Sequence, residues 1–421
     1  MRCNTLISSK QGYGFHALQI SAVLLGFSVP ISVAMDNVLL VIVLLGALLN
    51  VHAVWNMAKE NPLARAAWLL FLALFVAMFY GSPSVSDSLG ALGKYADLAF
   101  IPMFMLLFNN EIWRKRAVYA FLGAMGLTLL LSYLVALKLL PIQHWMTPYA
   151  VIDNPVIFHS HIAQNNMMAL AAFLALLQCR DALTSRIRFV WGLFAVLAMA
   201  NILFMVQGRT GYIILLAQLC WFAWSSLTRY FYLRGKVWGW RQGLMLLAAS
   251  VVLVGAAYVS SERLHDRVSM VKSEFHEWQP NHGKDTSTGQ RLDFYYNTLQ
   301  IVQQHPLLGV GTGGFPSAFA RQIAGNGAPL TVNPHNEFLL ITVQTGLGGL
   351  VLLLYLFYMH WHCALKLSTA FEQDAARGLL LMYLINCALN SALYDHVDGL
   401  LFAFMTAIFF SGYRCKVVKH E

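Results

Sequence analysis

Charged side chains are scarce in this sequence of 421 residues. Asp, Glu, Lys and Arg together make up 11% of it, whereas 58% of the residues are hydrophobic. Soluble domains carry roughly 25% charged residues, so the composition excludes an ordinary soluble enzyme. Apolar stretches long enough to cross about 30 Å of hydrocarbon recur along the whole chain. The sequence therefore predicts an all-α polytopic membrane protein.

The sequence also lacks the motifs of several common catalytic sites. It has no Gly-x-Ser-x-Gly elbow, no His-Glu-x-x-His motif, no Walker A lysine and no Asp-x-Asp pair. None of its six cysteines lies in the longest connection, residues 260–334, and no two cysteines have the spacing of zinc ligands. We therefore expect neither a metal nor a cofactor.

One Gly-rich stretch, from Gly309 to Gly314, matches the Gly-x-Gly-x-x-Gly pattern of dinucleotide sites. No predicted strand precedes it, which disfavours a nucleotide site. We predict a flexible turn or a nest of backbone N–H groups that binds an anion.

The apolar segments predict about twelve transmembrane helices. Nine precede residue 260 and three follow residue 334, so the predicted units are 1–259, the loop 260–334 and 335–421. The last two segments are short, and a re-entrant pair is the alternative there. The predicted spans are 15–34, 37–56, 64–80, 90–108, 116–139, 158–179, 187–206, 210–228, 240–259, 336–359, 377–393 and 397–412.

The net charge of +9 orients the chain in its membrane. Most of the 28 Lys and Arg residues fall in connections on one side, such as those around Arg114, Arg186 and Arg234. The positive-inside rule then places both termini in the cytoplasm and the loop 260–334 outside. The basic excess is explained by orientation, so we expect no nucleic-acid partner.

The exterior loop is predicted to be mostly helical. Apolar residues spaced by three and four indicate a first helix over about 264–278. Thr288 is expected to cap a second helix, which His305-Pro306 ends near Gln304. A third, short helix is predicted over Phe315–Ala324.

The segment in which this loop re-enters the membrane holds a histidine with catalytic potential. Asn333 is a good N-cap and Pro334 suits the first helical position, which would place His335 in the first helical turn. The positive end of the helix dipole disfavours a second proton, so a neutral imidazole could act as a general base. The alternative is that Asn333, His335 and Asn336 only satisfy free backbone N–H groups.

Two exterior arginines oppose the orientation signal and therefore suggest a function. Arg209 lies between Gly208 and Gly211, which are expected to let it approach a ligand closely, and Arg291 lies in the first turn of the second loop helix. Arginine suits bidentate binding of phosphate, so the pair could cradle a diphosphate. The alternative is a structural ion pair, for example of Arg291 with Asp293.

Further polar residues lie at membrane depth. Lys94 and Asp97 are three residues apart, so they either neutralise each other or bind an anionic head group. A polar cluster near the exterior end of the sixth span indicates a polar cavity, with helix packing as the alternative. Its members are His159, His161, Gln164, Asn165 and Asn166.

At these residues the sequence resembles the O-antigen ligase (WaaL-type) family, within the superfamily that also holds Wzy polymerases and protein O-oligosaccharyltransferases. The matching pieces are Gln207-Gly-Arg209-Thr-Gly, Gly289-Gln-Arg291-Leu and Asn333-Pro-His335-Asn-Glu337. Their order, topology and spacing fit the family. The resemblance covers roughly residues 200–360, with His161 to Asn166 as weaker support.

The resemblance implies an inverting, metal-independent glycosyl transfer at the periplasmic face of the bacterial inner membrane. The donor would be a polysaccharide on undecaprenyl pyrophosphate, and the acceptor a sugar hydroxyl of lipid A–core. His335 would take the acceptor proton, while Arg209 and Arg291 would bind the diphosphate. The expected substrate-binding residues around them are Lys94, His161, Gln164, Asn165, Asn333, Asn336 and Glu337.

Three alternative functions are weighed against the ligase. A polymerase tends to have two sizeable exterior loops, and a protein-glycosylating member often has a larger C-terminal region; this chain has one large loop and a short tail. A lipid-linked-sugar transporter would place its polar groups at mid-membrane, often with repeat symmetry. The polar groups here gather at one exterior face, which favours the enzyme.

Overall fold

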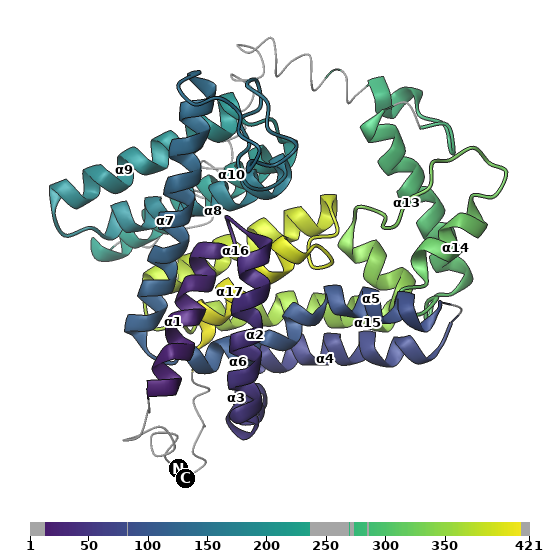
Figure 1. The fold of residues 1–421 in the computed structure, drawn as a ribbon, viewed down its shortest axis with the longest axis horizontal. Helices are drawn as coiled ribbons and strands as arrows, with labels where there is room; N and C mark the ends of the chain where they lie inside the picture. The colour runs from purple at the N-terminus through teal and green to yellow at the C-terminus, as the bar shows by residue number, and fades with distance from the viewer. Residues whose placement is uncertain (1–12, 82, 236–268, 270–272, 284–285, 414–421) are drawn as a thin grey trace.

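The computed structural model describes residues 13–81, 83–235, 269, 273–283 and 286–413, and most of these residues are helical (Figure 1). No strand occurs among the described residues; an isolated bridge joins Val151 to Asn154. The predicted all-α class is therefore confirmed.

Seven helices or continuous helix pairs are long and apolar enough to cross a membrane within the described ranges. They are α4 with the short turn η1 (Pro62–Phe79), α5 with α6 (Val85–Leu107), α7 (Glu111–Ala136), α8 (His161–Asp181), α9 with a π-helical turn (Ser185–Met205), α10 (Arg209–Leu233) and α15 (Glu337–Ala364). Other helices are α1 (Tyr13–Ser28), α16 (Ala370–Leu389) and α17 (His396–Phe410). The polytopic architecture is confirmed; the total of twelve spans stays a prediction, because 240–259 lies outside the described residues.

The predicted span 37–56 is not one straight helix. α2 (Val33–Leu49) and α3 (Val51–Glu60) meet at an angle of 91°, and together they would make an eighth span. Asn50 causes the break: its side chain donates to the Gly46 carbonyl at 2.8 Å and its backbone N–H to that of Ala47 at 2.9 Å. The helix is capped there from its own last turn.

The centre of the bundle is α17. Every residue from 397 to 410 is buried, although this helix has only 15 residues. It packs against α6, α7 and α16, and Phe404 contacts Phe104 and Phe108 edge to face. A helix enclosed by protein does not need the length or the outer apolar surface of a lipid-facing span.

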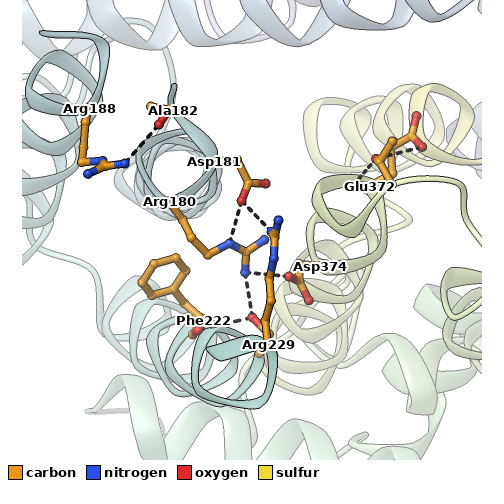
Figure 2. Close-up of polar contacts among 10 residues, drawn as sticks. Arg180, Asp181, Ala182, Arg188, Phe222, Arg229, Glu372 and Asp374 are labelled. Carbon is orange, nitrogen blue, oxygen red and sulfur yellow. Dashed lines mark hydrogen bonds and ion pairs between the residues drawn. The ribbon is translucent and has the colours of Figure 1, made fainter. Parts of the chain in front are cut away.

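Ion pairs fix one end of the bundle. Arg180 at the end of α8 lies 2.8 Å from Asp374 at the start of α16, and 3.1 Å from Asp181 (Figure 2). Arg229 of α10 contacts the same Asp181 at 2.7 Å. The arginines here are neutralised and tie three helices together. We call the opposite end, where α8, α10, α15 and α17 begin, the site end.

Two helices of the large loop lie beside the ends of α5 and α15 (Figure 1). α13 (Ser287–Gln304) is capped by Thr286, whose hydroxyl accepts from Gly289 N, so the predicted cap Thr288 was wrong by two residues. α14 (Phe315–Gln322) forms where the third loop helix was predicted. Residues 273–277 are helical, and most of the predicted first loop helix lies outside the described residues.

The Gly-rich turn from Gly309 to Gly314 does not form an anion nest. Its successive backbone N–H groups already have acceptors in the protein, so none is left to converge on an anion. Val310 and Gly311 donate to the carbonyls of Val343 and Gln344. Thr312 donates to Ala77 O, and Gly313 to the Gln344 side chain at 2.8 Å. The turn is a packing element between α4, α5 and α15, and a Cβ at Gly311 would lie 2.3 Å from the Tyr80 carbonyl oxygen.

Candidate active site

One face of α13 carries three contact residues of the predicted site. Thr288, Arg291 and Phe294 follow each other at intervals of three residues, which places them on the same side of the helix. Thr288 contacts Arg209, and Phe294 contacts His335. The three sequence motifs that predicted the site are therefore gathered along less than three turns of a single helix.

Arg209 is the first residue of α10 and lies at the site end. Its Nη1 atom is 3.4 Å from the Thr288 hydroxyl oxygen, and the residue is exposed. The flanking glycines serve another purpose than predicted: a Cβ at Gly208 would lie 2.4 Å from Asn165 Nδ2, and one at Gly211 would lie 2.7 Å from Asn165 Cβ. They let α10 pack closely on α8.

Asn165 is fully buried in that contact, and its amide approaches the Val206 carbonyl at 3.4 Å. Gln164 is also buried, and its Oε1 atom accepts from the backbone N–H of Ile157 at 2.8 Å. These positions favour the helix-packing alternative for both residues. His161, the first residue of α8, is only partly buried and lies within the electrostatic reach of Arg291.

Arg291 is partly buried and does not pair with Asp293. The Asp293 carboxylate faces the loop instead, where it accepts from the Trp278 indole and from the backbone N–H groups of Asn281 and Gly283, each at 2.8 Å. The structural ion pair offered as the alternative is therefore wrong. Among the described residues, no carboxylate forms an ion pair with the Arg291 guanidinium.

The Arg291 guanidinium contacts an amide at the end of α16. Its Nη2 atom lies 3.5 Å from Asn390 Oδ1, and Asn390 donates to Asn386 Oδ1 at 2.9 Å. Asn386 donates in turn to the buried carboxylate of Asp398 at 3.0 Å. Because Asp398 accepts from the Asn386 amide nitrogen, the Asn386 oxygen is left to accept from Asn390, which turns the Asn390 oxygen toward the arginine.

His335 does not lie in the first turn of α15, as its motif predicted. The helix begins at Glu337, Asn336 is the N-cap, and His335 has the left-handed φ of 52°. Asn333 causes this irregular turn, since its side chain accepts from the His335 N–H at 2.9 Å. An Asx turn therefore precedes the helix, and Pro334 is not its first residue.

The His335 ring stacks on Phe294, with 5.8 Å between the centroids. Tyr295, the next residue of α13, donates its hydroxyl to the His335 carbonyl at 3.2 Å. Burial lowers the pKa of His335 below 6.5, and the positive charge of Arg291 lowers it further. The imidazole is thus neutral at pH 7, for reasons other than the helix dipole.

The neighbours of His335 in its motif form the frame of the site. Asn333 also accepts from Ser391, and Asn336 donates to the Ala388 carbonyl at 2.9 Å. Glu337 is buried, with Tyr95 donating to one carboxylate oxygen at 2.8 Å and Leu393 N to the other at 2.8 Å. The Oδ1 atom of Asn333, the Asn336 amide and both Glu337 oxygens are engaged with protein, which favours positioning over substrate contact.

Lys94 and Asp97 do not neutralise each other. Lys94 ends α5 and is exposed, with its ammonium nitrogen 4.2 Å from the centre of the Tyr394 ring. Asp97 lies buried in α6. The prediction placed both residues on one face of a continuous helix. The helix is interrupted at Tyr95, however, so Lys94 and Asp97 lie in different surroundings. Lys94 is left accessible to an anionic ligand at the site end.

Sequence reasoning missed Thr288 as a contact of Arg209, and it missed Phe294, Asn386 and Asn390 altogether. The two asparagines had a signal, because they are four residues apart and so share one face of an apolar helix that is predicted to span the membrane. Phe294 had none, since an aromatic residue on an amphipathic helix is ordinary.

The comparisons agree with the resemblance found in the motifs. Residues 194–354 match the model of a family described as O-antigen ligase. This range holds Arg209, Arg291 and His335. An uncharacterised protein of Haemophilus influenzae is 25% identical over 118 residues, which cover 26% of this chain and 30% of the relative. The match thus spans less than a third of that relative.

Proposed function

We propose that this chain, which belongs to the O-antigen ligase/Wzy superfamily by its match over residues 194–354, transfers a glycan from a lipid diphosphate to a sugar hydroxyl. The donor is O-antigen polysaccharide on undecaprenyl pyrophosphate, and the acceptor is lipid A–core. The observation that carries the proposal is the single face of α13, from which Arg291 projects between the contacts to Arg209 and His335.

In this reaction His335 is the general base. The acceptor hydroxyl oxygen attacks the anomeric carbon of the donor sugar while its proton passes to the imidazole. The bond from that carbon to the diphosphate oxygen breaks, and the diphosphate leaves with the electron pair. One displacement inverts the anomeric centre. A base must be unprotonated at working pH, and the lowered pKa of His335 supports this role.

Arg209 and Arg291 bind the diphosphate and stabilise the charge that develops as it leaves. No described carboxylate neutralises either guanidinium, so both are available to an anionic ligand. This differs from the opposite end of the bundle, where Arg180 and Arg229 share Asp181 (Figure 2). Preorganised positive charge of this kind stabilises a transition state without a metal, which supports a metal-independent mechanism.

The membrane setting suits these substrates. Both are lipids with large polar head groups, so their reacting atoms meet at the membrane–water boundary. The basic residues at the opposite end support a cytoplasmic location for that end, which makes the site end periplasmic in the bacterial inner membrane.

The test is transfer by the purified protein in vesicles that contain lipid-linked donor and lipid A–core. We expect His335→Ala to abolish transfer while the protein keeps its thermal stability. The matched control is His282→Ala, since His282 is an exposed loop histidine that contacts its own turn at Pro280. Transfer by His335→Ala at the rate of the control would refute the proposed base.

A further inference from the structure

The connection between α13 and the Gly-rich turn contacts α15 well beyond the first turns of that helix. The N–H of Leu347 donates to the Pro306 carbonyl at 2.9 Å, and a Cβ at Gly346 would lie 2.0 Å from Leu307 O. α15 begins at Glu337, so at 1.5 Å per residue the contact with Leu347 lies about 15 Å along the helix. Gly346, with a φ of 69°, breaks the helix and makes room for the chain.

Contacts with a second span also place the segment inside the end of that span. Thr312 donates its hydroxyl to Leu74 O at 2.7 Å and its N–H to Ala77 O at 3.0 Å. The span that contains Leu74 and Ala77 runs from Pro62 to Phe79, so Leu74 lies five residues, about 7 Å, inside the end of that span. The segment from Pro306 to Thr312 therefore lies alongside two spans, below the ends of both.

The side chains at the tip of this segment are apolar and exposed. Leu307 is 76% and Leu308 is 62% exposed, next to Leu347 at 48% and followed along α15 by Val351 at 63%. Exposure of two adjacent leucine side chains to water at this depth would be unfavourable, whereas their exposure to lipid hydrocarbon is favourable. Their surface continues the lipid-facing surface of α15.

We infer that Pro306, Leu307 and Leu308 form a membrane wedge, a tip of the large loop that is embedded in the bilayer and contacts lipid acyl chains. The wedge anchors the C-terminal end of α13 in the membrane. Arg291 lies on the same helix, so the wedge sets the depth of its guanidinium relative to the lipid head groups. This inference rests on the fold alone and not on the proposed reaction.

Photo-crosslinking in native membranes tests it. A benzophenone amino acid is placed at Leu307 or Leu308, the membranes are illuminated, and peptides are analysed by mass spectrometry. Val351 is the positive control for lipid contact, and Gln303, an exposed polar residue on α13, is the control for water.

We expect lipid adducts at positions 307 and 308 with a yield within about twofold of that at 351, and no lipid adduct at 303. Adducts with a second polypeptide at 307 and 308 would overturn the wedge and indicate a protein partner. A yield as low as that at 303 would overturn it too. The measurement uses no glycan substrate, so its failure is separate from a failure of the proposed function.

Discussion

The Arg291 guanidinium lies 3.5 Å from the Oδ1 atom of Asn390. This amide oxygen faces the arginine because the Asn390 amide nitrogen donates to Asn386, which the buried side chain of Asp398 holds in turn. Asp398 is the acceptor at the end of that series. We therefore treat Asp398 as a positioning residue for Arg291, since no described contact joins the two directly.

Asp398→Asn keeps the volume of the side chain and replaces one of its two carboxyl oxygens with an amide donor. Asn386 then faces a side chain that can donate as well as accept, so the direction of Asn386 is fixed less firmly. We expect roughly a tenfold loss of kcat/KM for the lipid-linked donor, the equivalent of about 1.4 kcal/mol.

The control for this prediction is a double mutant. In an Arg291→Gln background, Asp398→Asn should cause almost no further loss, because the residue that it positions is gone. Losses that simply multiply would show that Asp398 acts on overall stability rather than through Arg291.

The pH dependence of transfer should report the charge of Arg291. A general base works in its neutral form, so activity falls as the pH drops through the pKa of His335, which burial and Arg291 hold below 6.5. Arg291→Gln removes the Coulombic part of that lowering. The pKa then rises, more imidazole is protonated at a given acidic pH, and the acid limb of the kcat/KM profile moves to higher pH.

The comparison variant for the pH profile is Arg321→Gln, which removes a positive charge from α14 instead. Its acid limb should coincide with that of the unmodified protein. An unmoved limb in Arg291→Gln would contradict the assignment of that limb to His335 beside Arg291.

Arg209→Lys tests bidentate binding of the diphosphate. Lysine keeps the charge but offers a single point donor, so we expect transfer to fall roughly 100-fold. Thr288→Val is the matched variant, because it removes the 3.4 Å contact of Arg209 and leaves the guanidinium in place. It should cost a few-fold at most. Full activity of the lysine variant would contradict bidentate binding and show that Arg209 contributes only its positive charge.

Gly346→Ala should destabilise the protein. Its φ of 69° is strained for alanine by about 1–3 kcal/mol, and the added Cβ would lie 2.0 Å from Leu307 O. We expect the thermal midpoint in detergent to fall by several degrees. Gly348→Ala, two residues along the same helix, meets nothing within 4 Å and should leave the midpoint unchanged or slightly raised.

The sequence could predict the membrane class, because that class depends on composition, and short motifs were enough to propose Arg209, Arg291 and His335 as candidate site residues. Long apolar runs predict helices without any tertiary information, and an exterior Arg is noticed because it opposes the charge asymmetry. The helices α13 and α14 were likewise predictable from N-cap residues, Pro306 and apolar spacing.

What failed depended on tertiary contacts. Asn333-Pro334 has the composition of a helix start, but the Asn333 side chain folds back onto the His335 N–H, and the start moves to Glu337. Gly208 and Gly211 were predicted to admit a ligand, yet Asn165 of another helix occupies the space beside them. Nothing local to either segment reveals the partner that decides its role.

The enclosure of α17 also has a consequence for biogenesis. It is the last helix that the structure describes, and its neighbours α6, α7 and α16 all precede it in the chain. The ribosome therefore synthesises the central helix of the bundle after the helices that surround it. Until then the inner faces of the earlier helices lack their packing partner, and the hydrogen-bond series behind Arg291 is complete only once Asp398 has been synthesised.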